Sequence, residues 1–130
     1  MSDDPRTGTT CPFCGPSPAD IVMQNALAYA RADAFPVNPG HTLIVPFRHV
    51  PSFFEVTEAE RVALLDLLCR CRDVLEERYH PDGWNIGVNV GPAAGQTVPH
   101  LHVHLIPRYA GDVPDPRGGV RGVVPEKKMY

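Results

Sequence analysis

Hydrophobic and polar residues alternate most regularly between residues 100 and 105, where the sequence reads His-Leu-His-Val-His-Leu. In a β-strand, successive side chains point to opposite faces, so every second residue shares a face. The pattern therefore predicts a strand with His100, His102 and His104 along one face and apolar side chains packed behind them. Each imidazole brings two polar nitrogens that need partners, which makes a row of histidines poor core material. We expect this face to bind or react with something outside the core.

Four further segments are predicted to form strands, because they combine apolar or alternating residues with flanking turn signals. They comprise residues 21–24, 26–32, 41–46 and 84–90. Gln24-Asn25 marks the corner of a hairpin between the first two. The fourth segment alternates apolar residues with asparagine and glycine, which is typical of a half-buried strand. A short glycine-containing loop joins it to the histidine strand, so these two strands are expected to pair antiparallel.

A long helix is predicted between two clear boundary signals. Thr57-Glu58-Ala59-Glu60 has the form of a capping box, in which the side chains of the first and last residue bond each other's backbone amides. The sequence His80-Pro81-Asp82-Gly83 ends the helix. Apolar residues recur three and four positions apart between the two signals, as in an amphipathic helix. The predicted apolar stripe consists of Leu64, Leu68, Cys71 and Leu75, widened by Leu65.

Strands, one long helix and further strands, without βαβ alternation, indicate an α+β domain. We expect an antiparallel sheet of about five strands, one long helix and a short one. At 130 residues the chain is interpreted as a single domain, residues 1–130. Residues 1–10 are expected to be flexible and residues 110–130 to form an extended tail. Such a sheet leaves an edge or face exposed, and a homodimer would cover it.

Charge and hydropathy exclude several classes of partner. A net charge of -3 argues against nucleic-acid binding, which favours a basic surface. The sequence contains no apolar run near the roughly 18 residues of a membrane span, and its first residues lack a signal-peptide pattern. We therefore expect a cytoplasmic protein without a membrane partner. The four cysteines are then expected to be thiols or metal ligands instead of disulfides.

The loop before the histidines has the chemistry of a phosphate site. Gly95-Gln96-Thr97 offers backbone N–H groups, a carboxamide and a hydroxyl, which are donors for an anionic oxygen. A neutral imidazole is a competent nucleophile near neutral pH. Its attack on phosphorus would give a phosphoramidate that water can cleave, and the central histidine is the natural position for it. A structural or metal-binding row of histidines remains the alternative, because His-x-His is also a common metal arrangement.

The segment from Gly95 to Arg108 resembles the signature of the histidine triad (HIT) family of nucleotide hydrolases and transferases. Pro39-Gly40-His41-Thr42-Leu43-Ile44-Val45-Pro46 resembles the family's second motif. The resemblance extends from Cys11 to the 115–121 tail, and the chain resembles diadenosine polyphosphate hydrolases within the family. It implies a five-stranded α+β fold, usually a homodimer, that acts on the α-phosphate of a nucleotide. His102 stands where the uridylyltransferase-like branch has glutamine, which argues against that branch.

The resemblance implies roles for seven residues. It makes His102 the nucleophile, His104 the histidine that flanks the phosphate, and His41 a supporting histidine. The residues implied to bind substrate are Gln96 and Thr97 in the phosphate loop, Asn89 at the ribose or α-phosphate, and Asp33 at the ribose hydroxyls. For Asn89 and Asp33, ordinary edge-strand or turn polarity remains the alternative.

Cys11 and Cys14 form a C-x-x-C pair, which alone is compatible with a redox pair, two zinc ligands or two thiols. Zinc needs two more ligands, and His49 and His100 are available. Many bacterial histidine triad proteins resemble this arrangement, so we expect structural zinc at these four residues. His100 would then anchor the N-terminus to the catalytic strand and take no part in proton transfer.

The expected activity is hydrolysis of dinucleoside polyphosphates or nucleoside phosphoramidates through a nucleotidyl-His102 intermediate, with a purine nucleotide as substrate. Mg²⁺ is expected only as a companion of a polyphosphate substrate. Two alternatives stay open: a nucleotide-binding regulatory module with incidental hydrolysis, and a phosphorylase-like transferase that uses phosphate as acceptor.

Overall fold

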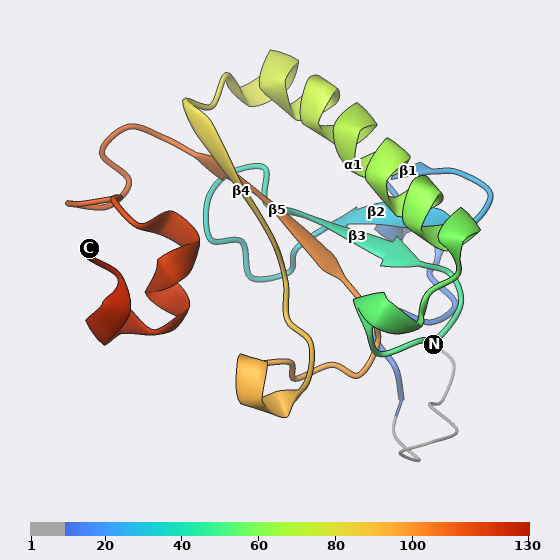
Figure 1. Ribbon diagram of the computed structural model, residues 1–130. Helices are drawn as coiled ribbons and strands as arrows, with labels where there is room; N and C mark the ends of the chain where they lie inside the picture. Colours follow the sequence, from blue (N-terminus) through green and yellow to red (C-terminus); the bar gives the residue numbers. More distant parts are fainter. Residues whose placement is uncertain (1–9) are drawn as a thin grey trace.

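The computed structural model describes residues 10–130, and its order of elements matches the sequence pattern (Figure 1). The predicted flexibility of the N-terminus concerns residues that lie almost entirely outside this range. One α-helix is present in the described part of the chain, together with short 3-10 turns. The helix and strands are β1 (Met23–Gln24), β2 (Ala28–Ala32), β3 (Thr42–Pro46), α1 (Glu58–Tyr79), β4 (Gly83–Val88) and β5 (Val103–Arg108).

The strands form one antiparallel sheet in the order β1-β2-β3-β5-β4. Helix α1 lies across one face of this sheet (Figure 1) and packs mainly on β1, β2 and β3. The main core lies between helix and sheet and includes Ala30, Ile44, Leu64, Leu67 and Leu105. These observations confirm the predicted α+β fold with a five-stranded antiparallel sheet. The expected short second helix is represented only by 3-10 turns, such as η2 (Phe53–Glu55) before α1.

The capping box of α1 is confirmed. The Thr57 hydroxyl accepts the Glu60 amide at 3.1 Å, and a Glu60 carboxylate oxygen accepts the Thr57 amide at 2.9 Å. The buried Glu60 carboxylate also pairs with the Arg48 guanidinium at 2.7 Å. Because Arg48 immediately precedes His49, this pair connects the turn after β3 to the start of the helix. The helix ends as predicted at His80, which adopts the left-handed conformation with φ 50°.

The prediction of the apolar stripe of α1 wrongly included Leu65 and omitted Leu67. Leu65 is 53% exposed, whereas Leu67, which was not included, is completely buried. Leu67 lies three residues after Leu64 and four before Cys71, so it faces the same direction as both. Only a narrow stripe is buried, because α1 contacts mainly three short strands.

The boundaries of β4 also differ from the prediction. The strand ends at Val88, so Asn89 and Val90 follow it. Ile86, which was expected to face the core, is 51% exposed. Strand β4 lies at the edge of the sheet and away from the main contacts of α1, so its apolar face is only partly covered. Trp84 does reach the core and donates its indole N–H to Glu76 at 3.2 Å.

The expectation that all three histidines lie in one strand was wrong for the first two. Strand β5 begins at Val103, so His100 and His102 precede it. The Leu101 amide donates to the Val50 carbonyl at 2.7 Å, and this bond directs the segment toward the turn after β3. The alternation nevertheless persists, because Leu101 and Val103 are both buried.

The C-terminal segment is folded and not extended. It contains two 3-10 turns, η4 (Gly119–Val123) and η5 (Pro125–Lys127), which lie beside the sheet on the side away from α1 (Figure 1). Among the residues described, no helix combines the length and apolar character needed to cross a membrane.

We expect Leu67→Ala to lower the free energy of unfolding by about 2–5 kcal/mol, because it leaves a cavity in a fully buried site. Leu65→Ala is the matched control on the exposed side of the same helix, with an expected change within about 0.5 kcal/mol. Urea-induced unfolding of both variants measures the difference. Equal losses would contradict the assignment of the buried stripe.

Candidate active site and metal centre

The predicted site residues come from separate parts of the chain and meet on the face of the sheet opposite α1. The pairing of β3 with β5 places Leu43 opposite His104, so the loop before β3 lies beside the histidine segment. The pairing of β4 with β5 places Gly87 on the other side of His104. His104 is therefore flanked by the segments that carry His41 and Asn89.

The backbone selects the tautomer of His102. Its Nδ1 lies 2.8 Å from the His100 carbonyl oxygen. Because a carbonyl oxygen can only accept, Nδ1 carries the proton and Nε2 of the neutral ring carries the lone pair. The Phe13 ring packs against the imidazole with ring centroids 5.0 Å apart. The half-buried His102 thus has a defined nucleophilic atom, Nε2.

The tautomer of His104 is selected through His41. The Val37 amide donates to Nδ1 of His41 at 3.0 Å, so His41 carries its proton on Nε2. That N–H lies 3.0 Å from Nδ1 of His104 and 3.3 Å from the Asp33 carboxylate. Nδ1 of His104 is therefore an acceptor, and the proton of His104 lies on Nε2.

Burial keeps both of these histidines neutral. It lowers the pKa of His41 below its ordinary value, although the Asp33 carboxylate acts in the opposite direction. Burial likewise lowers the pKa of His104, and the neighbouring His102 and His41 lower it further. Both rings are therefore mainly uncharged near neutral pH.

The imidazoles of His102 and His104 complement each other chemically. The rings of His102 and His104 are 5.2 Å apart between centroids. One offers a lone pair on Nε2 and the other an N–H on Nε2. A phosphoryl group between them would contact a nucleophile on one side and a hydrogen-bond donor on the other. These are the two groups needed for nucleophilic attack at phosphorus.

Asp33 is the predicted substrate residue that the structure brings closest to the histidines. Its carboxylate accepts the Phe35 amide at 2.8 Å as well as facing His41. Possible ligand atoms of Asp33, His41 and His104 lie within 4.8 Å of one another. A metal ion there would need the lone pair of His41 Nε2, which the Val37 amide bond assigns to Nδ1. The three side chains therefore fit a hydrogen-bonded relay better than a metal site.

Most hydrogen-bond donors of the loop before the histidines, residues 91–97, are already bonded to acceptors within or next to the loop. The amides of Ala94, Gly95 and Gln96 bond carbonyl groups within the loop. The Gln96 carboxamide accepts the Gly91 amide at 2.9 Å and donates to the Pro51 and Val98 carbonyls. Gln96 thus braces the loop, while the Thr97 side chain is exposed. Contacts of both residues with phosphate remain predictions.

Asn89 lies just beyond the end of β4 and lines the same cavity as His41 and His104. Its position is therefore compatible with the predicted contact to ribose or α-phosphate, which remains a prediction.

Cys11, Cys14, His49 and His100 come together as a possible metal centre. Sγ of Cys14 lies 3.1 Å from Nδ1 of His49 and 3.4 Å from Nδ1 of His100, and Sγ of Cys11 lies 3.3 Å from Nδ1 of His100. A tetrahedral zinc ion with bonds of about 2.0 Å to nitrogen and about 2.3 Å to sulfur separates its ligand atoms by roughly 3.3 to 3.8 Å. The spacings lie close to these values, and the two-sulfur, two-nitrogen donor set, buried except for the partly buried His49, fits a closed, structural metal site.

The ligating nitrogen of His100 is also selected by the backbone. Its Nε2 lies 2.9 Å from the Pro46 carbonyl and must donate to it. Nδ1 therefore carries the lone pair that a metal ion needs.

Two residues of the site escaped the sequence analysis. Phe13 packs on His102 from within the C-x-x-C segment, and Val37 orients His41 through its backbone amide. Periodicity does not reveal either role, because one depends on a loop returning to the sheet and the other involves no side chain. The position of Phe13 between the two cysteines of the C-x-x-C pair was the only available signal.

Comparison with known proteins agrees with this geometry. Residues 15–111 match the model of the HIT domain family. The chain belongs to the HIT family. The predicted resemblance is thus confirmed, and the matched range ends before the C-terminal segment of this HIT domain and begins after Cys11 and Cys14.

Two curated relatives of this HIT domain are named for activity on dinucleotides. The AP-4-A phosphorylase of Mycobacterium tuberculosis is 37% identical over 93 residues, which cover 71% of this chain and 48% of the relative. The asymmetrical bis(5'-nucleosyl)-tetraphosphatase of Schizosaccharomyces pombe is 36% identical over 97 residues, which cover 75% of this chain and 53% of the relative. The chain thus spans about half the length of these relatives.

A zinc-bound histidine triad family protein from Mycobacterium smegmatis has a similar solved structure. It superimposes with a TM-score of 0.67 at 31% identity, and the match covers 76% of each chain. Together with the Cys/His cluster, this makes a metal ion at the four-ligand site of the HIT domain chemically reasonable.

We expect Cys14→Ser to remove most of the metal from the purified protein, because it deletes a thiolate ligand. Cys69→Ser is the matched control, since Cys69 is exposed on α1 and remote from the cluster in sequence. Metal analysis by mass spectrometry should find zinc in wild type and in the control. Absence of zinc from wild type, or its retention in Cys14→Ser, would refute the assignment.

Proposed function

We propose that this HIT domain hydrolyses dinucleoside polyphosphates by transferring a nucleotidyl group first to His102 and then to water. The observation that carries the proposal is the pair of opposite tautomers. The His100 carbonyl leaves a lone pair on Nε2 of His102, while the relay from Val37 through His41 leaves a proton on Nε2 of His104. Both rings are half-buried, and their centroids are 5.2 Å apart.

In the first step, Nε2 of His102 forms a bond to the α-phosphorus and the bond from this phosphorus to the bridging oxygen breaks. The leaving group departs as a nucleoside polyphosphate. In the second step, water attacks the phosphorus, the N–P bond breaks, and a mononucleotide and a proton are released. The N–H of His104 supports the charge on a non-bridging oxygen in both steps. Division into two displacements is the advantage of covalent catalysis.

Four residues are proposed to hold the transferred nucleotide. Asp33 retains lone pairs beyond its two present contacts, so it can accept ribose hydroxyls. Asn89 would contact the ribose or α-phosphate, and Thr97 a phosphate oxygen. Gln96 would act mainly by shaping the loop. The preferred nucleotide is proposed to be a purine, with Mg²⁺ accompanying the polyphosphate.

Zinc at Cys11, Cys14, His49 and His100 is proposed as a structural part of the same site. It would fix the backbone of His100, whose carbonyl oxygen accepts a hydrogen bond from the Nδ1–H group of His102. The metal would therefore act on the nucleophile only through the position of this carbonyl.

A homodimer is also proposed, because β4 is an edge strand that exposes Ile86. Cytoplasmic location and the absence of nucleic-acid and membrane partners stay predictions.

Phosphorolysis is the second candidate activity, favoured by the name of the M. tuberculosis relative. It shares the nucleotidyl-histidine step and differs only in the acceptor, which is phosphate in place of water. Attack by phosphate would release a nucleoside diphosphate and not a mononucleotide.

We expect His102→Asn to lower turnover of diadenosine tetraphosphate at least about a thousandfold, because it removes the nucleophile. His80→Asn is the matched control: His80 is an exposed helix cap in a left-handed conformation, which asparagine adopts readily. Chromatography of the products measures the loss. Wild-type turnover in His102→Asn would contradict the mechanism.

The same assay separates the alternatives. Formation of AMP and ATP, unaffected by added phosphate, supports hydrolysis, whereas ADP formed only with phosphate identifies a phosphorylase. Nucleotide binding without repeated turnover would indicate a regulatory module.

A further inference from the structure

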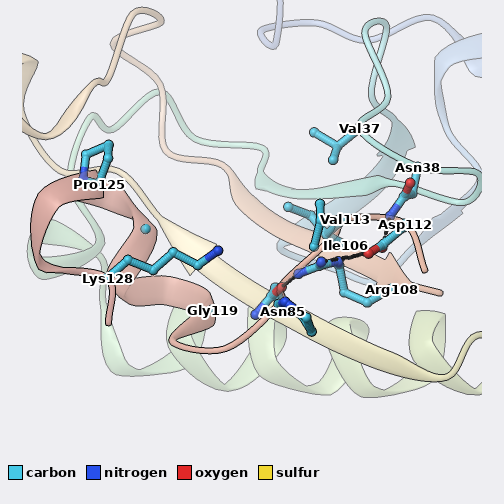
Figure 2. A pocket seen from close by; sticks show the side chains of 12 residues that line it. Val37, Asn38, Asn85, Ile106, Arg108, Asp112, Val113, Gly119, Pro125 and Lys128 are labelled. Carbon is cyan, nitrogen blue, oxygen red and sulfur yellow. Dashed lines mark hydrogen bonds and ion pairs between the residues drawn. The ribbon is translucent and has the colours of Figure 1, made fainter. Parts of the chain in front are cut away.

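A cavity of about 420 Å³ lies between the sheet and the folded C-terminal segment (Figure 2). Asn85, Ile106 and Arg108 line it from β4 and β5. Gly119 and Lys128 line it from the C-terminal segment. Its volume is within the range of small-molecule sites, about 300–1,000 Å³.

This cavity adjoins the candidate active site. A neighbouring cavity of about 400 Å³ is lined by His41 and His104, and it shares Val37, Asn85 and Ile106 with the first. The two cavities adjoin along these shared residues, and together they are called here the C-terminal channel, which extends from the histidines to Lys128. Along β5, the distance from His104 to Arg108 is about 13 Å at the usual rise per residue. The channel is therefore long enough for more than one phosphate.

The charges along the channel favour an anion at its far end. The Arg108 guanidinium is neutralised by two bonds to Asp112, at 2.7 and 2.8 Å. The Lys128 ammonium donates to the neutral Asp115 carbonyl at 2.8 Å, whereas the Asp115 carboxylate is paired with Arg117. Within residues 10–130, no carboxylate forms an ion pair with Lys128. Two of its three N–H donors are therefore available to a ligand. The Asp115 carboxylate also attracts the ammonium, but Arg117 offsets the charge of this carboxylate, so the group as a whole is positive.

The C-terminal segment is braced so that Lys128 reaches the channel. The Arg121 guanidinium donates to the carbonyls of Lys127 and Lys128 at 2.7 and 3.2 Å. Gly118 has φ 90°, and a Cβ there would collide with the Lys128 carbonyl. In Figure 2 the Lys128 side chain extends from the C-terminal segment toward Asn85 on the sheet.

We propose that the C-terminal channel binds the leaving half of a dinucleoside polyphosphate, with its distal phosphates at Lys128. This inference rests on the proposed function, which requires a leaving group next to His104. In displacement at phosphorus, the leaving oxygen departs roughly in line with the attacking atom. The channel begins beside His104 and leads away from His102, so it receives the departing polyphosphate. Its outer wall lies beyond the matched HIT range of residues 15–111 and is supplied by this chain's own C-terminal segment.

The test compares two substrates that share the adenylyl group. Diadenosine tetraphosphate has a long anionic leaving group, whereas adenosine 5'-phosphoramidate releases only ammonia. We expect Lys128→Ala to lower kcat/KM for the tetraphosphate by roughly tenfold, as for loss of one charged hydrogen bond, and to leave the phosphoramidate unchanged. Lys127→Ala is the matched control on the exposed neighbour, and Lys128→Arg should retain most of the activity. Equal losses on both substrates, or no loss on either, would overturn the proposal.

Binding of inorganic tripolyphosphate separates this proposal from the proposed function. Calorimetry should show weaker binding in Lys128→Ala and unchanged binding in Lys127→Ala. If wild type turned over neither substrate, the hydrolase assignment would fail, but this difference would still support the channel. Equal binding of tripolyphosphate by wild type and Lys128→Ala, or no binding by either, would reject the channel whatever the activity.

Discussion

The hydrogen bond from His102 Nδ1 to the His100 carbonyl determines which nitrogen of the central histidine can attack a substrate. Its geometry depends on the backbone at His100, and that residue is held from two sides. Its Nε2 donates to the Pro46 carbonyl, and its Nδ1 faces the two cysteines and His49. The possible metal centre and the candidate nucleophile are thus joined by one short segment, residues 100–102.

Sequence periodicity was sufficient for most of the fold. The capping box, the end of α1 and the antiparallel strands all follow from local signals, and the structure confirms them. The errors arose where tertiary contacts decide burial. Leu65 is exposed because it lies about 100° around α1 from Leu64, outside the buried stripe. Strand β4 ends at Val88, which pairs with the first residue of β5. The fold of the C-terminal segment depends on glycines and on Arg121, which carry no periodic signal.

The sequence predicted which residues form the candidate site, but not the hydrogen bonds that orient them. Alternation revealed the histidine row, and C-x-x-C with two further histidines predicted the four candidate metal ligands that the structure brings together. The separation of roles depends on backbone groups: the His100 and Pro46 carbonyls and the Val37 amide. Because every residue has these groups, side-chain patterns do not reveal which of them face a ring. For the same reason, the position of Gln96 in bracing its own loop could not be foreseen.

The assignment of opposite tautomers is the central claim, and nitrogen NMR of the histidine rings tests it most directly. Near neutral pH, the ring nitrogen shifts of ¹⁵N-labelled protein should show His102 protonated on Nδ1, and His41 and His104 protonated on Nε2. On acidification, His41 and His104 should stay neutral to lower pH than an exposed histidine, because burial lowers the pKa of both. A His102 ring protonated on Nε2 near neutral pH would contradict its role as the nucleophile.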